Sequence, residues 1–104
     1  MSAAPVFLSL DRVLAIHQRM VQAYGGRDGL RDRGLLESAI AMPQATFSGE
    51  LLHPTLSAQA AANLFHLCRN HPLVDGNKRT ALATSLMFLL VNGHRLNASK
   101  PEVE

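Results

Sequence analysis

Apolar residues recur at helical spacing from position 10 to position 24, where the first helix is predicted. Placed 100° apart, the apolar residues of this stretch fall within an arc of roughly 120°. Ser9 precedes the stretch with a hydroxyl suited to capping free backbone N–H groups, and Gly25 and Gly26 follow it. The arc consists of Leu10, Val13, Leu14, Met20, Val21 and Tyr24.

His17 falls within the same arc and has two readings. It is either a core histidine with a local hydrogen bond or a residue of a groove. We favour the core histidine.

A polar loop and a second, shorter helix are predicted next. Residues 25–34 form the loop because glycine and aspartate favour turns, and Asp32 is suited to cap a helix over residues 35–42 that Pro43 ends. Residues 45–52 are a short apolar stretch between Pro43 and Pro54. A β-hairpin flap is plausible there, with helix as the alternative.

Two further helices complete the pattern. The third is predicted from a cap at Ser57 to Asn70, with apolar surface and one narrow polar stripe. The fourth, residues 78–92, is apolar on nearly every side, which is typical of the centre of a bundle. Gly93 would end it, and residues 94–104 form a polar tail with little sign of structure. The polar stripe of the third helix consists of Gln59, Asn63, His66 and Asn70.

The fold class is therefore all-α, a compact bundle around a buried central helix. We expect a single domain over residues 1–104, because a chain of this length folds around one core. Apolar residues make up 47% of the chain and charged residues 17%, a balance that excludes general disorder.

Charge and cysteine usage narrow the class of protein. The net charge is only +2, without a long basic run, and there is one Tyr and no Trp, so we expect no direct binding of nucleic acid. Cys68 is the single cysteine, which excludes an internal disulfide. The first ten residues lack the basic start of a signal peptide, and no apolar run reaches the ~20 residues of a membrane span. We expect a cytoplasmic protein without membrane contact.

The candidate catalytic and binding residues lie in residues 71–80, HPLVDGNKRT, between the two most apolar helices. If Asn77 caps the fourth helix, the N–H groups from Gly76 to Thr80 point outward and form an anion site. Lys78 and Arg79 add two positive charges on that first turn.

Asp75 and His71 complete this interpretation. A carboxylate beside a phosphate site commonly holds Mg²⁺, and a neutral imidazole accepts a proton at cellular pH. Together, a base, a metal ligand and an anion site indicate an enzyme that transfers a group from a nucleotide to a hydroxyl. The alternative is an ordinary turn, with His71 ending the third helix and the cations solvated. Two cations at the positive end of a helix favour the anion site.

The same segment resembles the Fic/Doc family. HPLVDGNKRT matches the pattern H-x-F-x-[DE]-G-N-[GK]-R, and the lysine variant, here Lys78, is the death-on-curing form. The upstream segment YGGRDGLRDRGLLESAIAMP is similar to the same branch, so the likeness covers roughly residues 10–95.

The resemblance implies a small helical enzyme that uses ATP and Mg²⁺. It assigns catalysis to His71, as general base, to Asp75 and to Arg79. It assigns Mg²⁺ to Asp75 as well. Nucleotide binding falls to Gly76, Asn77, Lys78, Arg79 and Thr80.

The resemblance also implies an activity. Most Fic proteins transfer AMP, whereas death-on-curing toxins transfer the γ-phosphate of ATP to a threonine of elongation factor Tu and arrest translation. Lys78, and Leu82 where many AMP-transferring members have a second arginine, favour the kinase. The expected partners are the translation factor and a Phd-like antitoxin of a type II toxin–antitoxin system.

Departures from the pattern leave other readings open. Leu73 replaces the family's phenylalanine, and the chain after Gly93 is short for the family, so a final helix would be missing or supplied by a partner. Residues 46–50 fit the start of an inhibitory motif, but Leu51 follows where Gly or Asn is needed, so we expect no self-inhibition. The flap could instead pair with the substrate by strand addition.

Three alternatives to the kinase remain. The first is protein adenylylation. The second is an inactive helical module that binds an anion or a partner. The third, weaker one is a zinc site formed by His66, His71 and Asp75.

Overall fold

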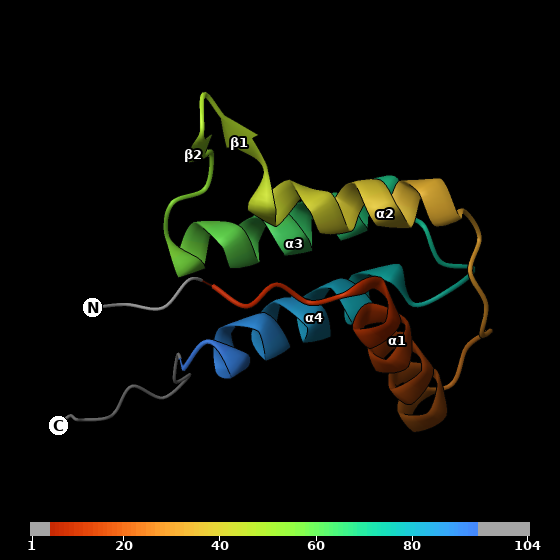
Figure 1. Ribbon diagram of the computed structural model, residues 1–104. Coiled ribbons are helices and arrows are strands. Elements are labelled where there is room, and N and C mark those ends of the chain that lie inside the picture. The colour runs from red at the N-terminus through yellow and green to blue at the C-terminus, as the bar shows by residue number, and fades with distance from the viewer. Residues whose placement is uncertain (1–4, 94–104) are drawn as a thin grey trace, which may run out of the picture.

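Four helices and one small hairpin follow one another along the chain, as the computed structural model shows for residues 5–93 (Figure 1). The predicted tail, residues 94–104, lies outside the described residues. The all-α fold class is confirmed. The elements are α1 (Leu10–Tyr24), α2 (Arg33–Ala41), the 3₁₀ turn η1 (Met42–Gln44), β1 (Thr46–Phe47), β2 (Glu50–Leu51), α3 (Leu56–Asn70) and α4 (Asn77–Val91).

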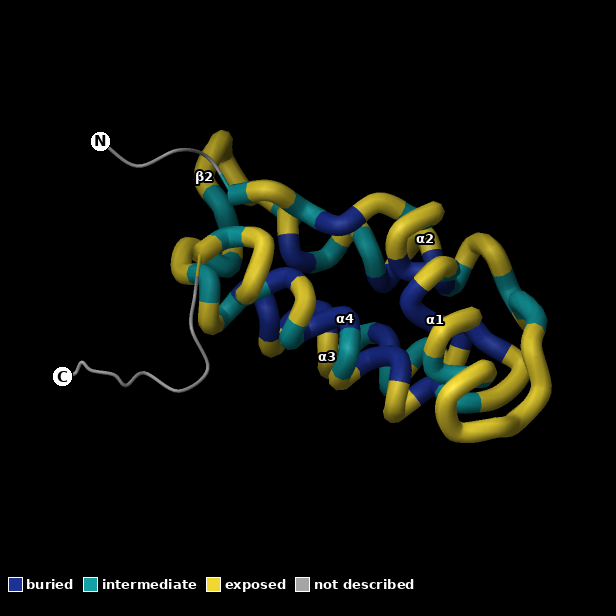
Figure 2. The backbone as a smooth tube through the Cα atoms, turned by 90° about the horizontal axis from the view of Figure 1, so that it is seen from below, coloured by how far each residue is buried: buried dark blue, intermediate teal, exposed yellow. Residues whose placement is uncertain are grey.

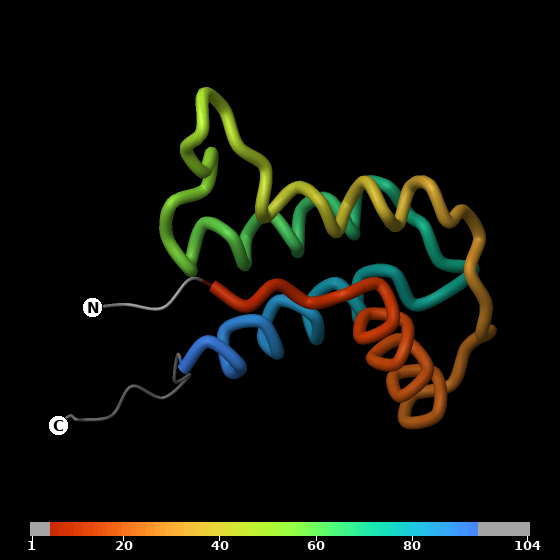
Figure 3. Tube along the Cα trace, viewed as in Figure 1, coloured from red at the N-terminus to blue at the C-terminus, as the bar shows by residue number. Residues whose placement is uncertain are grey.

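The helices stack so that α4 lies between α1 and α3, as the trace in Figure 3 shows. The short segment before α1 runs back along α4, where the ring of Phe7 stacks on that of Phe88 with centroids 5.8 Å apart. The side-chain amide of Asn92 then pairs with both backbone groups of Val6. The core includes Val13, Leu36, Leu67, Ala81 and Phe88.

Two of the predicted helix caps are confirmed and two are wrong. Ser9 and Asp32 accept hydrogen bonds from the first turns of α1 and α2, as expected. The cap of α3 is Thr55 rather than Ser57, because the Thr55 hydroxyl accepts the N–H of Ala58 at 3.0 Å. The cap of α4 is Gly76 rather than Asn77, and no side chain caps that helix.

The polar stripe of α3 partly faces inward, which reverses the usual orientation of an amphipathic helix. Gln59 is fully buried and donates to the backbone carbonyl of His53 at 2.8 Å. Asn70 donates to the carbonyl of Leu35 in α2 at 2.9 Å. Polar side chains on this face thus find hydrogen-bond partners in the backbone carbonyls of neighbouring segments.

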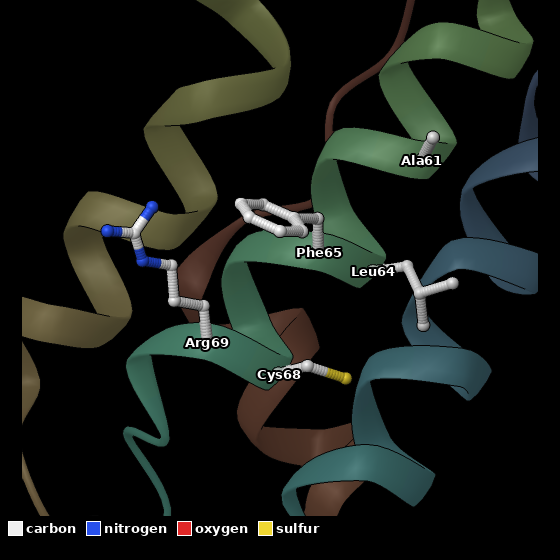
Figure 4. Close-up of a pocket in the computed structure, with 5 residues that line it drawn as sticks. All are labelled: Ala61, Leu64, Phe65, Cys68 and Arg69. Carbon is white, nitrogen blue, oxygen red and sulfur yellow. The ribbon is translucent and has the colours of Figure 1, made fainter.

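In exchange, α3 leaves apolar side chains exposed. Figure 4 shows Leu64 and Cys68 extending to the side of α4, and Phe65 and Arg69 extending to the other side. With Ala61 these residues line an apolar cavity of about 450 Å³.

The central position of α4 is confirmed, but the helix is not enclosed on every side (Figure 2). The side that packs on α3 carries small and polar residues, and the hydroxyl of Ser85 donates to the carbonyl of Ala60 across the interface. Small side chains allow this close approach. The exposed side carries Leu82, Met87, Leu90 and Val91.

A hairpin forms where the flap was predicted, but it lies far from the predicted site. β1 and β2 pair antiparallel around Ser48 and Gly49, whose φ angles are both positive, as a tight hairpin turn requires. The hairpin precedes α3 and His71 follows it, so the 15 residues of that helix separate the two by about 22 Å. Figure 1 shows the hairpin at one end of α3 and the loop at residues 71–76 at the other end.

None of the helices within residues 5–93 has the length and apolar character that a bilayer crossing requires.

Candidate functional site

The predicted chemistry lies in the loop between α3 and α4, which we call the motif loop (residues 71–76). His71 caps the C-terminal end of α3 with a left-handed backbone of φ 52°, and the buried Pro72 and Leu73 follow. The side chain of Asn77 closes the loop, because its amide donates to the carbonyl of Leu73 and accepts the N–H of the same residue, both at 2.9 Å. Asn77 is therefore a brace inside the loop and not a helix cap.

A second loop packs against the first, namely the polar segment of residues 25–32, which we call the glycine loop. The N–H groups of Arg31 and Asp32 both donate to the carbonyl of Pro72, at 2.8 and 3.0 Å. In return, the N–H of Val74 donates to the carbonyl of Gly29 at 3.0 Å. The two loops thus form one hydrogen-bonded unit, a relationship that the sequence pattern did not indicate.

His71 presents its imidazole to solvent at the edge of this unit. Its backbone is fixed, because the guanidinium of Arg31 donates to the carbonyl of His71 at 2.6 Å and to that of Asn70 at 3.0 Å. Among the described residues, no hydrogen bond occupies the imidazole ring. The backbone of His71 is therefore held in place, and the residue borders the cavity with an exposed imidazole.

The carboxylate of Asp75 lies between the two loops. One oxygen accepts the N–H of Gly76 at 2.9 Å, and the other accepts the N–H of Arg27 at 3.1 Å. The backbone hydrogen bonds from Arg27 and then Gly76, followed by the positive charges of Arg27 and Arg79, hold the pKa of this carboxyl below its ordinary value. Asp75 is thus a carboxylate at cellular pH, and each oxygen keeps a further lone pair for a cation.

The first turn of α4 offers three free amides, fewer than expected. The N–H of Gly76 is taken by Asp75, and that of Thr80 donates to the carbonyl of Gly76 at 2.9 Å. Asn77, Lys78 and Arg79 occupy the positions whose N–H groups have no partner within a helix. Thr80 is fully buried, so the structure does not bring its side chain to the surface with the others.

Arg79 and Lys78 are exposed on this turn, beside the amides. The guanidinium of Arg79 lies over the ring of Tyr24, the last residue of α1. The whole group borders a cavity of about 340 Å³ lined by His71, Val74, Asp75, Gly76, Asn77, Lys78 and Arg79. Every residue predicted for the site except Thr80 is therefore brought together at one opening.

Two neighbours of the site were not assigned to it from the sequence. His17 is buried beneath the motif loop, with Nε2 2.8 Å from the carbonyl oxygen of Asp75. Gly26 lies so close that a Cβ there would be 2.9 Å from the nearer Asp75 carboxylate oxygen. The apolar arc of α1 did indicate that His17 faces inward, and the paired glycines marked the turn. Neither pattern identifies Asp75 as the residue that His17 and Gly26 lie against.

The zinc alternative finds no support in the described part of the chain. Within residues 5–93, no group of three or more His, Cys, Asp or Glu side chains converges on one point. The larger cavity on α3 is lined by apolar side chains apart from Arg69 and holds no acid or base. The motif loop is therefore the candidate site for chemistry.

The chain is similar to known proteins over most of its length. The sequence profile of the Fic/DOC family matches residues 7–89, which include both loops. Toxin Doc of Mycolicibacterium smegmatis is 54% identical over 76 residues, which is 73% of this chain and 58% of that protein. Protein kinase doc of Escherichia phage P1 is 36% identical over 86 residues, or 83% of this chain and 68% of that protein.

The match to Toxin Doc thus spans less than two thirds of that protein's length. The family match itself extends from the segment before α1 almost to the end of α4, and it contains every element that builds the site. This chain belongs to the Fic/DOC family.

Proposed function

We propose that this protein is a toxin that transfers the γ-phosphate of ATP to a hydroxyl of another protein. The observation that carries the proposal is the convergence of a free imidazole, an ionised carboxylate and three amides with Arg79 on one cavity. The name of one relative, Toxin Doc, supports the assignment as a toxin, and the name of the other, Protein kinase doc, supports transfer of phosphate to a protein.

The first turn of α4 would hold the phosphates. Amides at a helix N-terminus bind anions through their N–H groups and the helix dipole. The guanidinium of Arg79 adds a fork of donors that matches phosphate oxygens, and Lys78 adds a second positive charge. Without an anion, these two cations would lie at the positive end of the helix, where they are unfavourable.

Asp75 fits a role in holding Mg²⁺. Mg²⁺ is commonly held by one or two carboxylates together with phosphate oxygens and water, and Asp75 is an exposed carboxylate next to the amides. When bound, the ion would offset the negative charge of the phosphates. The two backbone N–H groups on Asp75 keep its oxygens aimed in fixed directions.

His71 would act as the general base. The acceptor hydroxyl gives its proton to a ring nitrogen of His71 while its oxygen bonds to the γ-phosphorus. The bond from that phosphorus to the bridging oxygen breaks, and ADP leaves with the bond's electron pair. Because the ring is exposed, a protein substrate can approach it from solvent.

We further propose that the acceptor is a threonine of elongation factor Tu, that its modification arrests translation, and that a Phd-like antitoxin restrains the activity. This places the reaction in the cytoplasm, where the translation factor and ATP are found. The hairpin lies at the other end of α3 from His71, so strand addition there would contact the substrate away from the reacting hydroxyl.

The test is a labelling reaction with purified protein, Mg²⁺ and elongation factor Tu, run in parallel with γ-labelled and α-labelled ATP. We expect label on the factor from the γ position only, and loss of label with His71→Ala. His66→Ala is the matched control, because His66 lies on α3 outside the cavity, and it should label normally. Label from the α position would instead show AMP transfer, and equal labelling by His71→Ala would exclude the proposed base.

A further inference from the structure

His17 connects α1 to the motif loop through a single, partly buried hydrogen bond. Its side chain is 2% exposed, and its Nε2 lies 2.8 Å from the carbonyl oxygen of Asp75. A carbonyl oxygen only accepts, so Nε2 carries the proton and donates it. The other ring nitrogen, Nδ1, faces a carboxylate oxygen of Asp28 in the glycine loop at 3.7 Å.

This hydrogen bond fixes the peptide plane between Asp75 and Gly76. In a trans peptide the C=O and the N–H point in opposite directions. Because the carbonyl of Asp75 points inward to His17, the N–H of Gly76 points outward, where it donates to the Asp75 carboxylate at 2.9 Å. The inward direction of the Asp75 carbonyl therefore sets the outward direction of the Gly76 N–H.

The imidazole also supports the start of α4. Gly76 has a left-handed backbone with φ 72°, and a Cβ built there would lie 3.9 Å from both Nε2 and Cδ2 of His17. The ring thus packs directly under the residue from which α4 begins. A change in the ring would reach the Asp75 carboxylate and the free amides together.

We infer that His17 is a positioning residue for the nucleotide and metal site, acting through the peptide between Asp75 and Gly76. This inference rests on the proposed function. His17 does not touch the cavity itself. It acts by holding the carboxylate and the first turn of α4 in the orientation that binds Mg²⁺ and phosphate.

Two substitutions separate the hydrogen bond from the space that the ring fills. His17→Leu keeps an apolar side chain of moderate size but has no donor. His17→Gln keeps an N–H donor near the end of the side chain. Val13→Ala is the matched control, because Val13 is a fully buried residue of the same helix that belongs to the core. It destabilises the fold without removing a bond to the motif loop.

The experiment measures the dissociation constant of ATP with Mg²⁺ by calorimetry, together with thermal unfolding and hydrogen exchange of the Gly76 N–H by NMR. We expect His17→Leu to weaken ATP binding about 10-fold, which corresponds to ~1.4 kcal/mol, the size of a lost buried hydrogen bond. His17→Gln should recover most of that affinity. Val13→Ala should lower the unfolding temperature and leave the affinity unchanged.

The exchange measurement tests the inference without nucleotide. His17→Leu should speed exchange of the Gly76 N–H, and neither His17→Gln nor Val13→Ala should do so at temperatures where the fold is intact. Unchanged exchange and unchanged affinity in His17→Leu would overturn the positioning role, as would equal losses in Val13→Ala. If the wild-type protein binds no ATP, the proposed function fails, and the exchange rates still decide whether His17 holds the loop.

Discussion

The guanidinium of Arg79 lies over the ring of Tyr24, with Cζ 4.5 Å from the ring centroid. Tyr24 is the last residue of α1 and Arg79 is in the first turn of α4, so the contact joins two helix ends at the candidate site. A guanidinium stacked by its face keeps its N–H groups at the edge available for an anion. The tyrosine ring therefore orients Arg79 without using up its donors.

Replacing Tyr24 should weaken nucleotide binding without affecting the fold. Tyr24 is 64% exposed, and a cation–π contact at an exposed position is worth about 0.5–1 kcal/mol. Tyr24→Ala should therefore raise the dissociation constant of ATP about two- to fivefold, as measured by calorimetry. Tyr24→Phe keeps the ring and should bind like the wild type. Equal losses in both variants would show that the hydroxyl, and not the ring face, is what matters.

Gly26→Ala should disturb Asp75 directly. Gly26 has φ 105°, and an added Cβ would lie 2.9 Å from the Asp75 oxygen that accepts the N–H of Arg27. Gly25→Ala is the matched control, since its φ of 84° is also positive and strains a residue with a Cβ by ~1–3 kcal/mol, while a Cβ there meets nothing within 4 Å. Both should lower the unfolding temperature. Only Gly26→Ala should also weaken the binding of ATP with Mg²⁺, and similar binding by the two variants would contradict the prediction.

Arg31→Ala should lower the turnover number more than the affinity for ATP. Arg31 holds the carbonyls of Asn70 and His71, so its loss frees the backbone that carries the base and leaves the amides of α4 in place. Arg33 offers a control, because it is an exposed arginine whose salt bridge to Glu37 lies outside the cavity. In steady-state kinetics Arg33→Ala should behave like the wild type. A change in KM alone for Arg31→Ala would show that it acts on nucleotide binding.

The two backbone N–H groups that donate to the Asp75 carboxylate should make the stability of the fold depend on pH. Because they lower the pKa of Asp75 below its ordinary value of 3.8, its contribution is fully present above that value and is lost as the pH falls through the lower folded value. Asp75→Asn removes the contribution. The difference in unfolding temperature between wild type and variant should be constant over about pH 5–8 and should shrink below pH 3.8. A difference that grows on acidification would have the wrong sign.

The helices were predictable because local chemistry defines them. The apolar face of α1, the cap at Asp32 and the end of α2 before Pro43 each depend on a few neighbouring residues, and each was confirmed. Within the predicted arc, Tyr24 is the exception, because it is exposed. The cap of α3 was misplaced because Thr55 and Ser57 both carry a hydroxyl. Only the geometry of the first turn decides between them.

The site was predictable where its residues are adjacent in sequence and unpredictable where they are not. His71, Asp75 and Arg79 stand within one segment, so their spacing alone brings them together. The role of Asn77 depends on a loop that folds back on Leu73, and the position of His17 depends on a helix that packs beneath that loop. Such contacts follow from tertiary structure and have no local pattern.

The contacts between the two loops also determine when the candidate site can form during folding. The bonds that complete the site join residues 40, 48 and 58 positions apart, from Arg31 to His71, from Arg27 to Asp75 and from His17 to Asp75. Contacts of such separation carry a loop-closure cost and form only once the intervening helices have docked. A nascent chain that ends within α3 lacks the motif loop altogether, so the bonds that join the two loops can form only after the loop and the start of α4 have been made.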